Sequence, residues 1–153
     1  MVSLLHGLFR VYCFILNLLG GKIVGARALI LSPDGERVLL VYHTYCPNWF
    51  LPGGGVKRNE HPMEAVKREI FEEAGIQCLE DPEFLGVYHQ KYLGVDDYTI
   101  AYVVRKFTQE QAHSGEIKEV TWFPITALPK DMDPGSLRRI QEYCFKASKV
   151  SHW

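Results

Sequence analysis

Apolar residues recur along this chain with two different periods, and each period predicts one kind of secondary structure. Apolar runs bounded by turn-forming residues predict strands over residues 23–31, 37–42, 84–92, 98–107 and 120–123. Helical spacing of apolar residues predicts helices over residues 1–19, 61–74 and 135–147. Strands mixed with flanking helices predict an α/β/α layered sandwich with a mixed sheet.

Glycine and proline mark the boundaries between these elements. Residues 32–35 predict a turn between the first two strands, and residues 94–97 are expected to turn the longer hairpin. Residues 52–55 predict a tight glycine loop, whose backbone can point carbonyl and N–H groups toward ions and phosphates without a Cβ in the way. Gly75 follows the last apolar position of the middle helix, where a left-handed C-cap is usually glycine.

The first nineteen residues predict an amphipathic helix with a wide apolar face and a narrow polar stripe. Its uncharged part, residues 11–21, is shorter than the roughly 20 residues that a membrane span requires. We therefore divide the chain into an N-terminal helix, residues 1–21, and one domain, residues 22–153. The helix is expected to pack on the domain or at a homodimer interface, or to make a peripheral membrane contact. A secretory signal is a weaker alternative, because cleavage after residue 28 would cut the first strand.

Composition narrows the class of protein. The chain has 153 residues, enough for one domain with a real core. Its formal net charge of -1 provides no overall basic field for duplex nucleic acid, but it is compatible with a small anionic ligand bound through a metal. The four cysteines form no C-x-x-C pair, so we expect reduced thiols in a cytoplasmic protein.

Three glutamates carry the strongest chemical signal. Glu69, Glu72 and Glu73 lie at positions i, i+3 and i+4, so a helix places all three carboxylates on one face. Such crowding is unfavourable unless a cation shares it, and hard oxygen ligands suit Mg²⁺ or Mn²⁺. Arg68 is close enough in sequence to pair with one of these carboxylates and to fix its direction.

The glutamates belong to a longer pattern, in which U is an aliphatic residue. The segment from Gly54 through Glu60 and the three acids to Gly75 and Ile76 fits G-x5-E-x7-R-E-U-x-E-E-x-G-U at every fixed position. With this complete box the chain resembles the Nudix (MutT-like) hydrolase family, over about residues 22–147. The resemblance implies a divalent-metal enzyme of α/β/α architecture that cleaves nucleoside diphosphates linked to another moiety.

The resemblance also implies roles for the box residues. The Gly53 carbonyl and the carboxylates of Glu69, Glu72 and Glu73 are expected to hold the metals, and Glu69 is the expected base for the attacking water. The metals would lower the pKa of that water and neutralise charge on the diphosphate. Glu60 is expected to brace the loop against the helix, while Gly54 and Gly75 are structural. The sequence departs from the common pattern at Asn59, where many relatives carry glycine.

Outside the box the sequence names candidates and leaves alternatives open. A further carboxylate often enters this kind of site from a loop before a late strand, and Glu116 fits that position, with Glu119 as runner-up and a solvated loop charge as the alternative. Stacking on a base is a candidate role for Trp49 and Tyr92, which as aromatic residues beside strands also suit a core. Base-reading acids occur in some relatives just before the last helix. Asp131 and Asp133 lie there, and a helix cap explains them equally well.

These observations predict a Mg²⁺-dependent pyrophosphohydrolase that acts on a small nucleotide-type substrate. The alternative is a Nudix-like sensor that binds such a ligand without turnover, at a membrane or on a partner through the N-terminal helix. The intact acid cluster favours the enzyme, because a pure sensor does not need so many converging acids.

Overall fold

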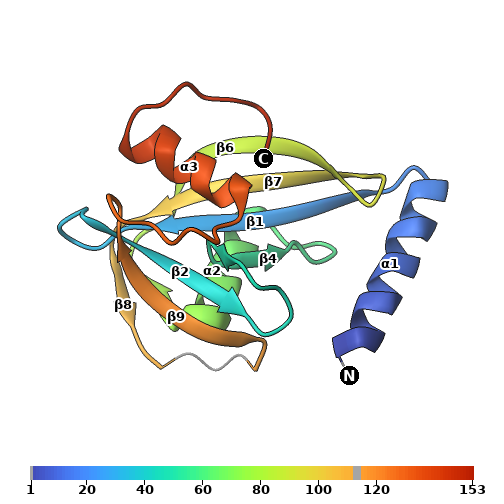
Figure 1. Ribbon diagram of the computed structural model, residues 1–153, viewed down its shortest axis with the longest axis horizontal. Helices are drawn as coiled ribbons and strands as arrows, with labels where there is room; N and C mark the ends of the chain where they lie inside the picture. The colour runs from blue at the N-terminus through green and yellow to red at the C-terminus, as the bar shows by residue number, and fades with distance from the viewer. Residues whose placement is uncertain (1, 112–114) are drawn as a thin grey trace.

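The computed structural model describes residues 2–111 and 115–153, with side chains from residue 10 onward. The described elements follow the order α1 (Val2–Leu18), β1 (Lys22–Ile30), β2 (Arg37–His43), β3 (Trp49–Phe50), β4 (Gly53–Gly55), α2 (Pro62–Ala74), β5 (Ile76–Cys78), β6 (Glu83–Tyr92), β7 (Val95–Val104), β8 (Phe107–Gln109), β9 (Ile117–Pro124) and α3 (Pro134–Cys144). Figure 1 shows their arrangement.

The largest sheet is mixed, as the sequence predicts. Its strand order is β4-β1-β7-β6, with β1 parallel to β7 and antiparallel to β4, and with β6 antiparallel to β7. A second sheet has the order β3-β2-β9, and β5 pairs with β8 as a third. The first two strands are therefore joined in sequence, yet they belong to different sheets.

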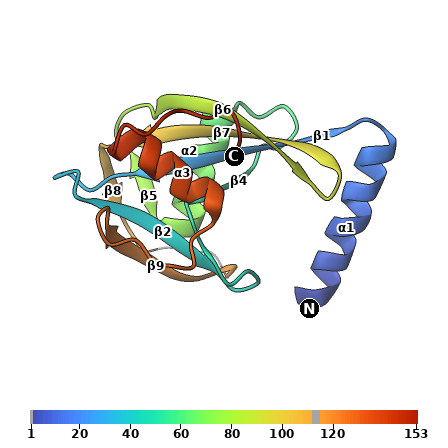
Figure 2. The same ribbon diagram turned by 45° about the horizontal axis from the view of Figure 1, so that its top comes forward.

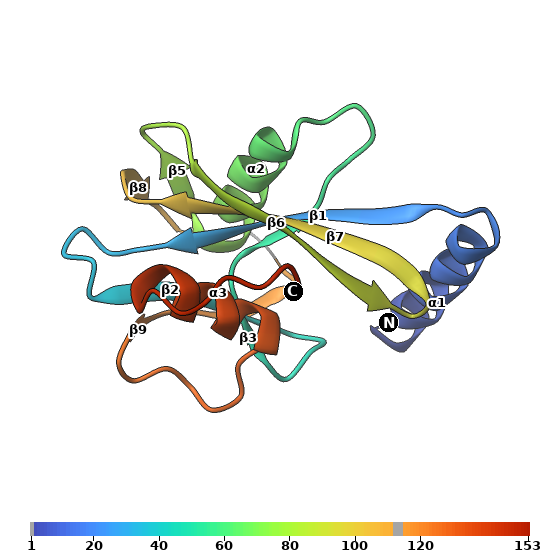
Figure 3. The same ribbon diagram turned by 90° about the horizontal axis from the view of Figure 1, so that it is seen from above.

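Two apolar layers hold the helices on opposite sides of these strands. Ala26, Ala28 and Ile30 pack in the layer that contains the buried face of α2. Leu29 and Leu31 pack in the layer that contains α3. Successive residues of a strand point to opposite faces, so β1 contributes to both layers. Figure 3 shows α2 and α3 on the two sides, which confirms the α/β/α arrangement.

Both ends of α2 are fixed by specific residues. The His61 ring caps the first turn by accepting a hydrogen bond from the Met63 N–H, and Pro62 occupies the position that needs no N–H donor. Gly75 ends the helix with φ of 67° and donates to main-chain carbonyls of the last turn. A Cβ at Gly75 would lie 2.2 Å from the Glu110 carbonyl oxygen, so only glycine fits both requirements.

The structure corrects several boundaries: β9 begins at Ile117 rather than residue 120, and α3 ends at Cys144 rather than residue 147. Three further corrections concern the glycine segment, the hairpin turn and the end of β7. The glycine segment is not only a loop, because Gly53–Gly55 pairs with β1 as the short strand β4. The hairpin turns at Leu93 and Gly94, both with positive φ, so residues 95–97 lie inside β7 rather than in the turn. Finally, β7 ends at Val104, and the next residues form β8, which pairs with β5. Strands of two or three residues carry too little periodicity to be found from sequence.

The helix α1 stands at one end of the long sheet, beside the tip of the β6–β7 hairpin and away from α2 (Figures 1 and 2). Cys13 is fully buried, and Gly94 at the hairpin tip lies next to Asn17. Leu16 is partly buried, and the other described apolar residues are exposed, at Val11, Tyr12, Phe14, Ile15, Leu18 and Leu19. Over residues 10–18, packing on the domain therefore covers only a narrow stripe of the helix. No helix in the described part of the chain has the length and apolar character needed to cross a membrane.

Candidate metal and active site

The acidic face of α2 lies against β4. The Gly53 N–H donates a 2.8 Å hydrogen bond to Glu73 Oε2. Gly54 lies against Glu69, because a Cβ at Gly54 would come within 2.5 Å of the Glu69 carboxyl carbon. Glycine at this position therefore leaves the space that the carboxylate occupies. The pairing of β4 with β1 fixes this segment beside the helix, so strand and helix together position the acids.

Arg68 connects the loop, the helix and the acids. Its guanidinium bonds both carboxylate oxygens of Glu60, at 2.8 and 3.0 Å, and Glu69 Oε1 at 2.6 Å. It also lies 3.6 Å from Glu72 Oε2. Glu60 in turn accepts a hydrogen bond from the Lys57 N–H, so it links the loop before α2 to the helix. These contacts lower the pKa of Glu60 to about 2, chiefly through the Arg68 hydrogen bonds.

Glu73 is the buried member of the acid group. Its side chain is 10% exposed, against 52% for Glu72. Burial raises the pKa of Glu73 to about 7, the Arg27 charge and the Gly53 N–H oppose that rise, and the neighbouring carboxylates add to it. The charge of Glu116 is one of these contributions, so the structure brings Glu116 near Glu73. The Glu116 carbonyl accepts a hydrogen bond from the Thr44 N–H, which fixes this loop against the end of β2.

Three further residues lie at the site although the box does not contain them. Arg27 Nη1 donates to the Gly53 carbonyl at 2.5 Å and to the Leu51 carbonyl at 3.3 Å. His43 Nε2 lies 4.0 Å from Glu73 Oε1, and its Nδ1 has no hydrogen-bond partner in the described residues. Burial and the Arg27 charge lower the pKa of His43 to about 4, so the ring is neutral near pH 7. Burial raises the pKa of Tyr45 to about 12, while Arg27 opposes this shift.

Sequence reasoning missed Arg27 and treated His43 as an ordinary strand histidine. The available signal was a single arginine between Ala26 and Ala28, both fully buried, in a strand that is otherwise mostly apolar. A charged side chain in such a strand needs a polar destination. The sequence gives no direct indication that this destination is the Gly53 carbonyl.

The residues fit a divalent metal in type. Carboxylates from one helix face and a backbone carbonyl are hard oxygen donors, and glycine at position 54 leaves room for the Glu69 carboxylate. Within residues 2–111 and 115–153, no three His, Cys, Asp or Glu side chains converge closely enough to hold an ion as they stand. The reason is visible in the contacts, since Arg68 holds Glu69 and the Gly53 N–H holds Glu73.

Most of the expected substrate-contacting residues lie in other surroundings. Trp49 is only 8% exposed and packs edge-on against Tyr42 and Phe123, so it belongs to the core. Asp133 caps α3, because its carboxylate accepts hydrogen bonds from the Ser136 N–H and hydroxyl. Asp131 is exposed, and its carbonyl accepts the Trp49 N–H. Of the alternatives left open by the sequence, the helix cap thus describes Asp133, and the core role describes Trp49.

Tyr92 lies at the far end of the sheet from the acids. It ends β6 at the hairpin tip, opposite Val95, beyond the point where Lys22 begins β1. Gly53 pairs with Arg27, further along the same strand. The span from Lys22 to Arg27 covers about 17 Å of extended chain. Tyr92 is therefore not brought together with the acidic face of α2.

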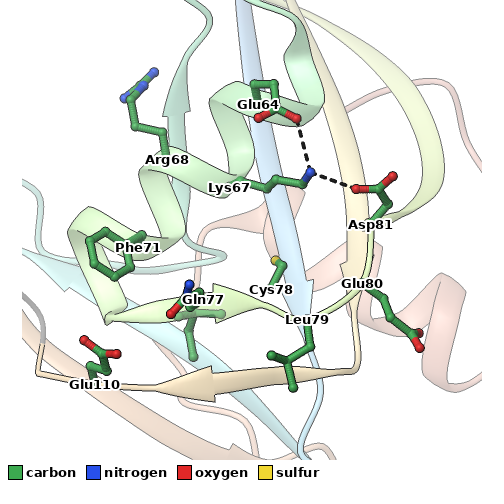
Figure 4. Close-up of a pocket in the computed structure, with 11 residues that line it drawn as sticks. Glu64, Lys67, Arg68, Phe71, Gln77, Cys78, Leu79, Glu80, Asp81 and Glu110 are labelled. Atoms are coloured by element: carbon green, nitrogen blue, oxygen red, sulfur yellow. Dashed lines mark hydrogen bonds and ion pairs between the residues drawn. The ribbon is translucent and has the colours of Figure 1, made fainter.

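A groove of about 650 Å³ runs along another side of α2 (Figure 4). Phe71, Cys78 and Leu79 contribute to its lining. Lys67 lies at its edge between the carboxylates of Glu64 and Asp81, at 3.1 and 2.8 Å. None of the three acids at positions 69, 72 and 73 lines this groove. Arg68, which holds Glu69, does line it, so the groove borders the candidate metal site.

Comparison with known proteins identifies the family. The family model described as NUDIX domain matches residues 21–143. A putative 8-oxo-dGTP diphosphatase of Bacillus subtilis is 31% identical over 127 residues, which cover 83% of each chain. An RNA pyrophosphohydrolase of Bartonella henselae is 38% identical over 134 residues, 71% of this chain and 72% of the relative. Another relative, 30% identical, is matched over only 14% of its own length.

A solved structure shares the fold. The crystal structure of a MutT NUDIX hydrolase from Burkholderia pseudomallei superimposes with a TM-score of 0.72 at 26% identity, covering 80% of this chain and 98% of the other. The family match covers all the box residues and the strands that position them. This chain belongs to the NUDIX family of hydrolases.

Proposed function

We propose that this protein is a Mg²⁺-dependent pyrophosphohydrolase, with Mn²⁺ as an alternative ion, which cleaves the diphosphate linkage of a nucleotide or nucleoside-diphosphate derivative. The observation that carries the proposal is the acidic face of α2 lying against β4, with Glu73 on the Gly53 N–H and Glu69 against Gly54. The Bacillus subtilis relative, named as a diphosphatase of a modified nucleoside triphosphate, supports this class of substrate.

In this proposal Gly53, Glu69, Glu72 and Glu73 hold the metal. When bound, the ion would neutralise charge at the diphosphate and lower the pKa of the attacking water. Glu69 would accept a proton from the attacking water at its carboxylate, with Glu116 as the further carboxylate from the loop before β9. Arg68 orients Glu69 through its 2.6 Å contact, and the bond to Glu60 fixes the guanidinium in turn. Asp131 stays a candidate for base recognition, because it is exposed before α3.

Residues 22–153 form the catalytic unit in this proposal, and the N-terminal helix serves assembly or attachment. Its described apolar side chains are largely exposed, with Leu18 at 70%, and contiguous apolar surface of this kind usually marks an interface. A second copy of the chain and a membrane surface are the two partners to be tested. The four free cysteines are consistent with a cytoplasmic protein.

A panel of nucleoside triphosphates, including oxidised purines, and nucleoside-diphosphate derivatives tests the proposal. Each compound is incubated with the full chain and Mg²⁺, and release of phosphate or pyrophosphate is measured alongside binding. We expect Mg²⁺-dependent turnover of at least one compound and none in chelator. Binding of a nucleotide with no turnover of any compound would instead favour a sensor.

A further inference from the structure

Arg27 is a cation of the site to which the proposed chemistry has assigned no role. It lies on β1, where its neighbours Ala26 and Ala28 are fully buried, and it is itself partly buried. Its two hydrogen bonds go to the carbonyl oxygens of Gly53 and Leu51, at 2.5 and 3.3 Å. Among the described residues it forms no ion pair with a carboxylate. A guanidinium that donates hydrogen bonds only to backbone carbonyls has no anion in direct contact to neutralise its charge.

The charge of Arg27 lies where several elements meet. It opposes the rise that burial causes in the pKa of Glu73 on α2 and of Tyr45 in the loop after β2, and it lowers the pKa of His43 on β2. Glu116, from the loop before β9, acts on two of the same groups. The guanidinium therefore lies close enough to Glu73 for the two charges to interact, without a direct ion pair between them. Glu73 and Glu116 are the carboxylates whose charges reach the same place.

The Gly53 carbonyl is also the oxygen that we assign to the metal. A carbonyl oxygen has two lone pairs, so it can accept a hydrogen bond and a metal ion together. A guanidinium nitrogen 2.5 Å from that oxygen would nevertheless place a second cation close to the ion. Two cations at such a distance repel each other unless an anion lies between them. A diphosphate is the anion that both cations can share.

We propose that Arg27 binds a non-bridging phosphate oxygen of the substrate beside the metal, exchanging its bond to the Gly53 carbonyl for that contact. This inference rests on the proposed function, because it takes the same site to receive a diphosphate. The planar fork of arginine matches a phosphate group in a way that the single ammonium of lysine does not. Arg27 then contributes to substrate affinity and opposes binding of the metal alone.

The test measures the affinity for the metal and the affinity for a diphosphate analogue separately in the full chain. Mn²⁺ alone is titrated into the wild type, Arg27→Gln and Arg27→Lys, and methylenediphosphonate, whose P–C–P bridge is not hydrolysed, is then titrated at saturating Mn²⁺. Glutamine keeps a donor for the carbonyls and removes the charge. The matched control is Arg37→Gln on β2, the next strand in sequence, where the arginine is half exposed and lies 3.8 Å from Asp34.

For Arg27→Gln we expect Mn²⁺ affinity to rise by about threefold to tenfold as a repelling cation is lost. Diphosphonate affinity should fall by about tenfold or more, the scale of one charged hydrogen bond. Arg27→Lys should recover only part of the loss, and Arg37→Gln should match the wild type in both titrations. Unchanged melting temperature in Arg27→Lys would show that weaker diphosphonate binding is not a folding defect.

Two results overturn the inference. In the first, both Arg27 variants bind the diphosphonate with the same affinity as the wild type. The other is a fall in Mn²⁺ affinity that accounts for the whole loss, because Arg27 would then only position the Gly53 carbonyl. The proposed function can fail separately. A wild type that hydrolyses no nucleotide, yet binds diphosphonate through Arg27, supports the inference alone, and a wild type that binds no diphosphonate with Mn²⁺ overturns it.

Discussion

Glu73 is a residue for whose carboxylate protons and metal ions compete. Burial raises its pKa from 4.5 to about 7, and the Arg27 charge and the Gly53 N–H only reduce that rise. A carboxylate must lose its proton to hold a metal. Protons and metal ions therefore compete for Glu73 just below neutral pH, although an ordinary glutamate would be ionised there.

Metal affinity should consequently depend on pH in the range below about 7. Apparent Mn²⁺ affinity of the wild type is expected to fall by about tenfold per pH unit as the pH drops below 7, and to level off above it. Isothermal titration from pH 5.5 to 8 measures this. Glu73→Gln should bind Mn²⁺ more weakly and with a flatter pH dependence. Equal slopes in the two proteins would remove Glu73 as the titrating group.

The same pKa values fix the sign of stability changes in the absence of metal. Glu73, with its raised pKa, stabilises the fold below pH 4.5, and that contribution is lost as the pH rises through about 7. His43 acts oppositely, because its pKa falls from 6.5 to about 4. Its contribution is present above pH 6.5 and is lost as the pH falls through about 4. The two effects oppose each other over the pH range in which both titrate.

Arg68 tests whether the geometry of a guanidinium is needed. It holds both oxygens of Glu60 and one oxygen of Glu69, which an ammonium cannot reproduce. Arg68→Lys should keep the fold and weaken Mn²⁺ affinity or turnover by about tenfold or more, as removal of an orienting partner does. Circular dichroism with metal titration and steady-state kinetics check this. A variant that matches the wild type in both would make Arg68 an ordinary surface pairing.

At the scale of elements, β4 is a spacer between β1 and α2. A Cβ at Gly54 would meet the far end of the flexible Glu69 side chain, whereas a Cβ at Gly55 would meet nothing within 4 Å. Gly54→Ala should therefore keep a melting temperature near that of the wild type, displace Glu69 and weaken Mn²⁺ binding by about tenfold. Gly55→Ala is the matched control. Similar Mn²⁺ affinity in both variants would contradict this role of β4.

Long elements were predictable from the sequence because their apolar residues repeat many times. The box helix, predicted at 61–74, is confirmed as Pro62–Ala74, with the left-handed cap at Gly75. The short strand β4 was not, because three glycines carry no side-chain pattern, and their pairing with β1 depends on residues distant in sequence. Asn59 adopts φ of 61°, which explains why glycine is common there and why asparagine is tolerated.

For the whole molecule, the sequence predicts the family and the acidic helix face, because both are local patterns. Arg27 and His43 reach the same site from β1 and β2, and no spacing along the chain indicates that these two residues lie at one site. Conversely, Trp49 was a candidate for stacking on a base because of its residue type, but it is buried in the core. The parts of the site that depend on tertiary packing required the structure.

The N-terminal helix is separate from this site in the whole molecule (Figure 2). Deletion of residues 1–19 should leave hydrolysis per site largely intact, because none of the box residues lies there. It should change oligomeric mass, solubility or liposome binding, since the exposed apolar surface is removed. Light scattering, sedimentation with liposomes and kinetics on both proteins measure these properties. Lost activity in a folded truncation would mean that the helix helps to build the active site.

The most direct test of the metal-dependent hydrolase is turnover at saturating Mg²⁺ in the wild type, Glu72→Gln and Glu73→Gln. The control is Glu64→Gln, an exposed acid of the same helix that pairs with Lys67 and lies outside the acidic site. We expect about 100-fold or greater loss of kcat in the two site variants, the scale of a lost electrostatic stabiliser, and none in the control. Turnover near that of the wild type in both site variants would contradict it.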